Sequence, residues 1–186
     1  MWFFTTVSYN YTKYVKNFVP TTILGKRYEP YDRYRRGYTG LLKLTGRLAD
    51  NLRLSMMGQY KYSFSPHAGA GPFTTADYTD RRKYPSYIVT GILSWFISTD
   101  TILEVKGGHN MIKIISVHQP GAENNYTYYD NYTGYSWGGR HREEEVIRWS
   151  WQANTHLTHF EDDFLGGSHE MRAGLELFYG VSDWFI

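Results

Sequence analysis

Apolar and polar side chains alternate along several long stretches of this chain. The clearest runs from Leu52 to Phe64, where apolar or small residues hold the even positions and polar or charged residues hold most of the odd ones. Because strand side chains point to opposite faces with a period of two, this stretch predicts a strand with one apolar and one polar face. It is roughly twice as long as the strands of about 5–6 residues that are usual in soluble domains.

The same alternation predicts an antiparallel meander of about seven long strands. We expect them at about Trp2–Tyr14, Gly37–Leu48, Leu52–Phe64, Tyr87–Ser98, 103–111, Glu145–Phe160 and 171–179. The fourth is apolar on both faces, which predicts that something packs against it from inside the fold. Apolar positions show no helical spacing, so no helix of normal length is expected, and Val181–Ile186 is expected to begin another loop.

Short and long connections alternate between these strands. The short ones are Ala49–Asn51, Thr99–Thr101 and Glu161–Ser168, and the long ones are about Val15–Arg36, Ser65–Ser86 and Ser116–Glu144. A tilted strand of about 9–11 residues crosses a bilayer. Long strands with one apolar face, long loops on one side and short turns on the other are typical of outer-membrane barrels. The pattern therefore predicts an all-β fold that forms a partial transmembrane β-barrel.

Composition narrows the function classes. Aromatic residues make up 18% and charged residues 20% of the 186 residues, and Tyr and Trp favour membrane interfaces and binding surfaces. A net charge of +2 gives no indication of nucleic-acid binding. The absence of Cys excludes disulfides, thiol catalysis and thiolate metal sites. No apolar run is long enough for a transmembrane helix, and the start lacks the features of a signal peptide. We therefore expect an internal piece of a longer precursor.

The third long connection carries the candidate ligand-binding residues. It is rich in Tyr and Asn, which supply rigid amphipathic area and adaptable hydrogen bonds at recognition surfaces. The candidates are Tyr126, Tyr128, Tyr129, Tyr132, Tyr135 and Trp137. A disordered polar loop is the alternative interpretation of the same composition.

Neither catalysis nor a metal site is indicated. The chain has no nucleophile elbow, no phosphate-binding Gly loop and no paired-carboxylate motif, so we expect no enzyme activity and no cofactor. His156 and His159 would lie on opposite faces of a strand, and the spacing around His141, which precedes three Glu residues, enforces no ligand geometry. We therefore expect no bound metal.

Two segments resemble the barrel portion of TonB-dependent outer-membrane receptors, particularly the Oar-type branch. The first is 160–176, in which Gly167-Ser168-His169-Glu170 introduces a strand, similar to a recurring periplasmic turn and strand of that family. The second is 42–55, similar to the family's strand-turn-strand unit around a short polar turn. Together these segments cover about a sixth of the chain.

The resemblance implies a receptor of the bacterial cell outer membrane that takes up a scarce large nutrient, such as a chelated metal, a glycan or a peptide. Such receptors resemble a 22-stranded barrel filled by a plug. Residues 1–186 then form a single barrel segment that lacks the plug and the remaining strands. The implied partners are membrane lipid, an unidentified nutrient ligand and, through the missing plug region, a TonB-type energy-transducing complex, but no nucleic acid.

Two other functions remain open at this point. A soluble all-β glycan-binding module would bury the apolar face beneath a second sheet, whereas a barrel turns that face toward lipid. An adhesin-like barrel without transport is the other alternative.

Overall fold

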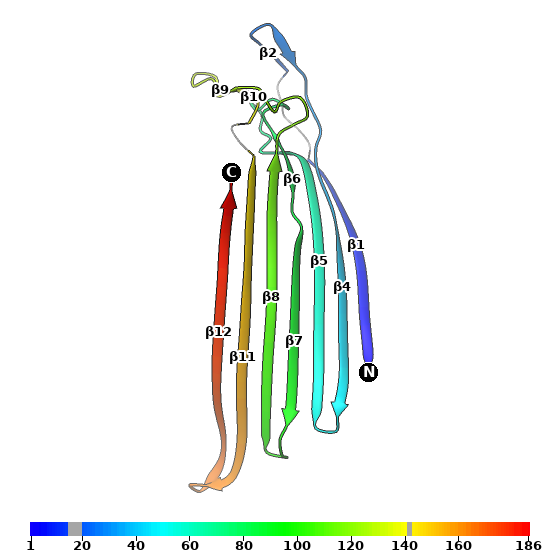
Figure 1. Cartoon of the computed structure of the whole chain (residues 1–186), viewed down its shortest axis with the longest axis vertical. Helices are drawn as coiled ribbons and strands as arrows, with labels where there is room; N and C mark the ends of the chain where they lie inside the picture. The colour runs from blue at the N-terminus through cyan, green and yellow to red at the C-terminus, as the bar shows by residue number, and fades with distance from the viewer. Residues whose placement is uncertain (15–19, 141–142) are drawn as a thin grey trace.

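The chain folds as an all-β protein, shown here as a computed structural model (Figure 1). The structure describes residues 1–14, 20–140 and 143–186, with only the backbone for residues 163–164. Strands make up 73% of the described residues, which contain no helix. The strands are β1 (Trp2–Tyr14), β2 (Thr21–Ile23), β3 (Lys26–Tyr28), β4 (Arg33–Ala49), β5 (Leu52–Ala68), β6 (Asp80–Lys83), β7 (Ser86–Phe96), β8 (Thr101–Val117), β9 (Thr127–Tyr129), β10 (Ser136–Gly138), β11 (Glu144–Phe164) and β12 (Gly167–Phe185). No helix in the described part of the chain is long and apolar enough to cross a membrane.

Seven long strands form one antiparallel sheet, in the order β1, β4, β5, β7, β8, β11, β12. The short strand β6 lies in line with β7, and both pair with β5 on one side and β8 on the other. Pro85 separates them, because proline has no N–H to donate to the ladder. The predicted meander of about seven long strands is confirmed.

The connections divide between the two ends of the sheet. The turns of the β4–β5, β7–β8 and β11–β12 hairpins lie at the lower end in Figure 1, and the long connections lie at the upper end. The β11–β12 turn is only Leu165-Gly166, both at positive φ, so these strands continue through most of the predicted Glu161–Ser168 connection. The two termini lie at opposite ends, as an odd number of long strands requires.

The register confirms the predicted separation into two faces. Residues paired across neighbouring strands share a face, and one such row crosses the whole sheet. It consists of Phe3, Leu44, Met56, Gly91, Gly107, Ala153 and Leu177. Parallel rows place Leu52, Leu54, Leu103, Val105, Trp149, Trp151 and Leu175 on the same face, which we call the apolar face. Arg53, Lys61, Lys106, Arg148 and Arg172 lie on the opposite, polar face.

The main sheet is a single layer, and neither of its faces is covered by another sheet of the described residues. Leu177 on the apolar face is 61% exposed and Phe178 on the polar face is 70% exposed. The only buried hydrophobic residues among those described are Phe64 and Ala68, in the last part of β5, and Ala122, in the connection between β8 and β9. The described residues therefore bury few apolar side chains within the sheet itself.

The structure corrects several sequence-based expectations. Val181–Ile186 does not begin a loop, because β12 continues to Phe185 and pairs with β11 up to Glu145. The strands β4, β5, β8, β11 and β12 are longer than their patterns predicted. The sequence also missed the two short hairpins β2–β3 and β9–β10 within the long connections. Strand β7 is partly apolar on both faces, and the sequence predicts that something packs against it from inside the fold. Among the described residues, no second layer covers its polar-face side chains Ile92 and Phe96.

Candidate functional site

The Tyr/Asn-rich connection forms a small hairpin beyond the end of the main sheet. Strand β9 pairs with β10, and Trp137 lies directly opposite Tyr128. The rings of this pair stack with their centroids 5.4 Å apart and their planes 12° apart. Gly138 has a φ of +85°, and a Cβ there would clash with the backbone oxygen of Tyr126, so glycine is required at this position.

Asp130 holds the tip of this hairpin. Its carboxylate accepts hydrogen bonds from the Thr133 hydroxyl and from the backbone N–H of Tyr132, which lies 2.9 Å away. Its backbone carbonyl accepts a further bond of 2.8 Å from Gly134, which has a positive φ. The Thr133 hydroxyl, followed by the Tyr132 N–H, lowers the pKa of Asp130 below its ordinary value, because both bonds favour the ionised carboxylate.

The candidate aromatic residues divide into exposed and packed sets. Tyr132 is 97% exposed and Tyr126 is 79% exposed, and Tyr129 is also exposed. Tyr135 is half-buried and packs edge-to-face on Phe73 with a centroid distance of 5.3 Å. The structure therefore joins Tyr128 with Trp137 and anchors Tyr135, and it leaves the other three rings at the surface of the loop.

A buried polar layer connects this hairpin to the preceding long connection. The backbone N–H of Thr75 donates to the carbonyl of Ser136 at 3.0 Å, and the N–H of Ser136 donates to the carbonyl of Phe73 at 2.8 Å. Thr75 is fully buried, and its hydroxyl also bonds Asp77 at 2.5 Å. These bonds fix the Tyr/Asn-rich hairpin against residues that lie about 60 positions earlier in the chain.

An ion cluster of Asp80, Arg82 and Arg140 underlies the same layer. Asp80 is 1% exposed, and its carboxylate contacts the guanidinium of Arg82 at 2.6 Å and that of Arg140. Burial raises the pKa of Asp80 because it disfavours the charged form, although both guanidiniums and the hydrogen bond from Arg82 oppose this effect. A buried, paired carboxylate stabilises one particular arrangement of β6 and the 134–140 segment.

Sequence reasoning missed this cluster. Arg81–Lys83 looks like an ordinary solvated basic loop, and Arg140 lies about 60 residues further along the chain. The spacing of Asp80 and Arg82 was the available signal of an ion pair, because residues two apart in a strand lie on the same face. Tyr31 was also missed: its hydroxyl donates to the carbonyl of Thr74 at 2.7 Å, and burial raises its pKa to about 12.

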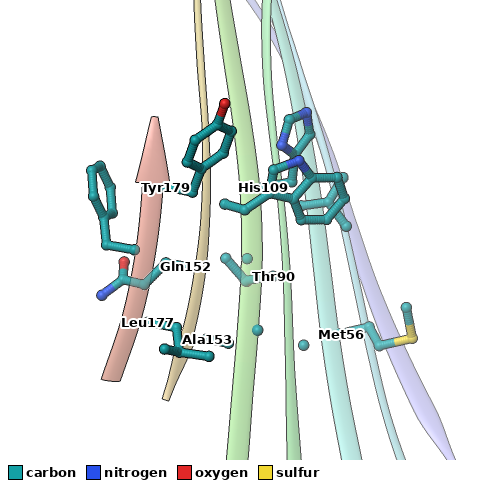
Figure 2. A pocket seen from close by; sticks show the side chains of 13 residues that line it. Met56, Thr90, His109, Gln152, Ala153, Leu177 and Tyr179 are labelled. Carbon is teal, nitrogen blue, oxygen red and sulfur yellow. The ribbon is translucent and has the colours of Figure 1, made fainter. Parts of the chain in front are cut away.

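The apolar face contains a hollow of about 800 Å³ (Figure 2). Gly91, Gly107 and Ala153 belong to its central row, and Met56 and Leu177 belong to the same row at either side. The hollow contains no Asp, Glu, Lys or Arg among its described lining residues.

His109 lines this hollow and is held by hydrogen bonds on both sides of its ring. Its Nδ1 donates to the carbonyl of Ser150 at 2.9 Å, because a carbonyl can only accept. Its Nε2 lies 3.0 Å from the Tyr87 hydroxyl, and its ring stacks on Trp151 with the centroids 4.1 Å apart. Both ring nitrogens therefore have a hydrogen-bond partner within the sheet.

The described residues bring no three metal-ligating side chains together. His156 and His159 point to opposite faces of β11, and His159 instead contacts the Thr101 hydroxyl at 2.8 Å and Glu161 at 3.1 Å. His141 lies outside the described residues.

Comparisons with protein-family models, with curated proteins and with solved structures find no match to this chain. The sequence and the geometry above are therefore the basis for assigning a function. They establish an all-β, antiparallel sheet with one apolar face, one polar face and an ordered hairpin of aromatic residues at one end.

Proposed function

We propose that this chain forms a section of the wall of a TonB-dependent receptor barrel in the bacterial outer membrane. In this arrangement the apolar face contacts lipid, the polar face lines the lumen and the long connections face the outside. The receptor takes up a scarce large nutrient through this barrel, with the 126–137 aromatic residues as its first contact.

The observation that carries the proposal is an uncharged band on the apolar face. From the row of Leu52 to the row of Tyr60, none of the apolar-face positions on the described strands carries Asp, Glu, Lys or Arg. On the polar face the rows between these two carry charged residues on four of the seven long strands. These are Lys43, Arg47, Arg53, Glu104, Lys106 and Glu176, and Lys61 and Arg148 follow in the next row.

The height of the band supports a bilayer as its solvent. Eight residue steps at ~3.3 Å cover about 26 Å along the strand, and a tilt of ~40° reduces this to about 20 Å. Outer-membrane barrels have an apolar band about 25 Å tall. Charged residues begin directly beyond it on the same face, where the amine of Lys113 pairs with Glu145 at 2.6 Å.

Aromatic side chains gather at the upper border of the band, as they do at membrane interfaces. They are Tyr9, Tyr38, Tyr60, Tyr62, Tyr87, Trp149, Trp151 and Tyr179. Tyr38 and Tyr62 stack with a centroid distance of 5.3 Å, and Trp149 meets Tyr179 edge-to-face at 5.5 Å. Trp95 is the aromatic residue of the Leu52 row near the opposite border.

The receptor assignment itself rests on the resemblance of segments 42–55 and 160–176 to this family. The two edge strands support a larger barrel, because β1 and β12 each pair on one side only. Strands β1 and β12 both run toward the end with the long connections, so they cannot close antiparallel on each other (Figure 1). Further strands therefore complete the wall, and energy coupling occurs through a plug that this segment lacks.

The 186 residues contain no cysteine, so this segment allows a direct test by cysteine labelling once any cysteine elsewhere in the full-length protein has been replaced by serine. Tyr132→Cys marks the aromatic hairpin, and Asp50→Cys marks a turn at the opposite end of the sheet, where the Asp50 side chain is fully exposed. The full-length protein encoded by the reading frame that contains this segment is expressed in bacteria, and a membrane-impermeant maleimide is added to intact cells. We expect Tyr132→Cys to react at once and Asp50→Cys to react only after the outer membrane is permeabilised.

Fractionation of the same cells provides the control, because the protein must sediment with the outer membrane. A soluble protein in which both cysteines react equally contradicts the barrel and favours the glycan-binding module. An outer-membrane protein whose uptake of every tested ligand is unaffected by loss of the energy-transducing complex contradicts the receptor and favours the adhesin-like barrel.

A further inference from the structure

A second, smaller hollow of about 130 Å³ opens on the polar face near the end with the long connections. It is centred on Gly37, whose missing side chain leaves a gap in the row formed with Asn10 and Ser63. A Cβ at Gly37 would lie 2.4 Å from the backbone oxygen of Tyr62. The close approach of β4 and β5 therefore requires glycine here, and the gap is a consequence of the fold.

Two cations border this gap from the rows on either side. Arg35 lies one row toward the long connections, and Lys61 lies one row toward the centre of the sheet. The Arg35 row and the Lys61 row are four residues apart on β4, which is about 13 Å along the strand. Both side chains line the hollow, one from each side of the Gly37 row.

Neither cation is neutralised within the described structure. Arg35 donates from Nε to the Ser63 hydroxyl at 2.6 Å and lies over the Tyr84 ring at 5.1 Å, and no described carboxylate pairs with it or with Lys61. The bond to Ser63, which is 4% exposed, fixes the Nε edge of the guanidinium. The two terminal nitrogens remain available as a fork for a bidentate acceptor.

The rest of the lining adds no negative charge: it consists of Arg36, whose position belongs to the opposite face of the sheet, and of neutral residues. Asn10, Thr12 and Thr39 line the hollow together with Ser63, and the described lining contains no Asp or Glu. The nearby Asp32 is engaged by the amine of Lys13 at 2.9 Å. The hollow therefore combines a net positive charge with several small polar side chains.

We propose that this hollow binds the oxyanion group, carboxylate or phosphate, of a small-molecule ligand. The guanidinium fork of Arg35 takes two oxygens, the Lys61 amine takes a third contact, and the side chains of Asn10 and Thr39 complete the site. A volume of about 130 Å³ equals about four water molecules at ~30 Å³ each, which suits such a group and excludes a whole large ligand.

This site deepens the proposed function, since it names a chemical class for the nutrient, and it rests on that function for the route by which a ligand arrives. The polar face is the lumen face of the proposed barrel. The hollow then lies in the wall just below the outer connections, where an anionic nutrient passes after its first contact with the aromatic hairpin.

Calorimetric titration tests the site in the full-length protein that contains this segment, purified in detergent. The probes are inorganic phosphate for the phosphate group and citrate for the carboxylate group, with glucose as the uncharged control. We expect at least one anion to bind at low salt and glucose not to bind. Arg35→Gln and Lys61→Gln should each weaken binding about tenfold or more, since a hydrogen bond to a charged group contributes at least that much.

Arg53→Gln is the matched control, because it removes one positive charge from the same face outside the hollow. It should leave anion binding unchanged. Arg35→Lys keeps the charge but loses the fork, so it should bind more weakly than wild type and more tightly than Arg35→Gln. Heat-modifiable gel mobility checks that each variant is folded.

Two results overturn the inference: neither anion binds, or Arg53→Gln weakens binding as much as Arg35→Gln does. The preferred probe separates phosphate ligands from carboxylate ligands. The labelling of Tyr132→Cys on intact cells tests the barrel separately, because its result does not depend on anion binding. Arg35-dependent anion binding by a protein that lies outside the outer membrane would therefore refute the proposed function and leave this site in place.

Discussion

Arginine in place of Met56 tests which solvent the apolar face meets. Met56 lies in the middle of the uncharged band, four residues from both Leu52 and Tyr60, and it is 43% exposed. Four residue steps at ~3.3 Å and a tilt of ~40° place it about 10 Å from each border of the band. Little packing is lost there, so the main cost is the charge, which is about 2–4 kcal/mol at the midplane of a bilayer.

Met57 provides a matched control in the same strand. It is the same residue type, it follows Met56 directly, and it points to the polar face, where it lies opposite Lys43 and Thr90. An arginine there meets like charge across the strands, which costs at most about 1 kcal/mol. We therefore expect Met56→Arg to lower the free energy of unfolding by at least about 1 kcal/mol more than Met57→Arg does.

The measurement is urea-induced unfolding of the full-length protein from phospholipid vesicles, followed by the heat-modifiable shift in gel mobility. Fits to both variants and to wild type give the two differences in the free energy of unfolding. Equal losses for the two variants, or a larger loss for Met57→Arg, would refute the assignment of the apolar face to lipid.

Three further predictions concern the loops and the edges. Asp80→Asn should cost about 1–3 kcal/mol and accelerate proteolysis of the 69–79 connection, because two guanidiniums lose their buried carboxylate. The pKa of Asp130 is lowered, so its ionised carboxylate should stabilise the hairpin tip fully above pH 3.8, and this stabilisation should be lost as the pH falls through the lowered pKa. Amide hydrogen exchange at Tyr132, whose N–H bonds that carboxylate, measures the loss. Expressed alone, the 186-residue chain should aggregate, because both edge strands expose unpaired backbone; a protease-resistant, heat-modifiable monomer closed between its first and last strands would contradict this.

The sequence predicted the strands that alternate strictly and erred where the alternation fades. Leu52–Phe64 is correct at its start, because a period of two over many residues has no helical interpretation. The far ends of β5 and β11 were missed, because their residues 65–68 and 161–164 are mostly polar or turn-forming and no apolar face marks the strand. The far end of β8 was missed for another reason: it is apolar, but the adjacent Ile114 and Ile115 interrupt the alternation. Val181–Phe185 was missed for a related reason: aromatic and small residues there follow no alternation, and pairing with β11 decides the structure.

The candidate site was predicted in composition only. Tyr and Asn identified the 126–137 segment, but its hairpin depends on the turn at Asp130 and on bonds from Ser136 to Phe73 and Thr75. The hollow at Gly37 was not predicted, because it forms where three strands place Asn10, Gly37 and Ser63 side by side. Cross-strand neighbours of this kind depend on register, which a single sequence does not specify for distant strands.

The sequence by itself determined the all-β class, the seven long strands, the two opposed faces and the two unlike ends, because each follows from a local period of two and from loop length. Tertiary structure alone decided what lies beside what: the joining of Asp80 to Arg140, the stacking of Tyr128 on Trp137, and the gap between Arg35 and Lys61. The physical reason is that alternation assigns a residue to a face, whereas a binding site needs residues from several strands at one level. That level is set by hydrogen-bond register across the sheet.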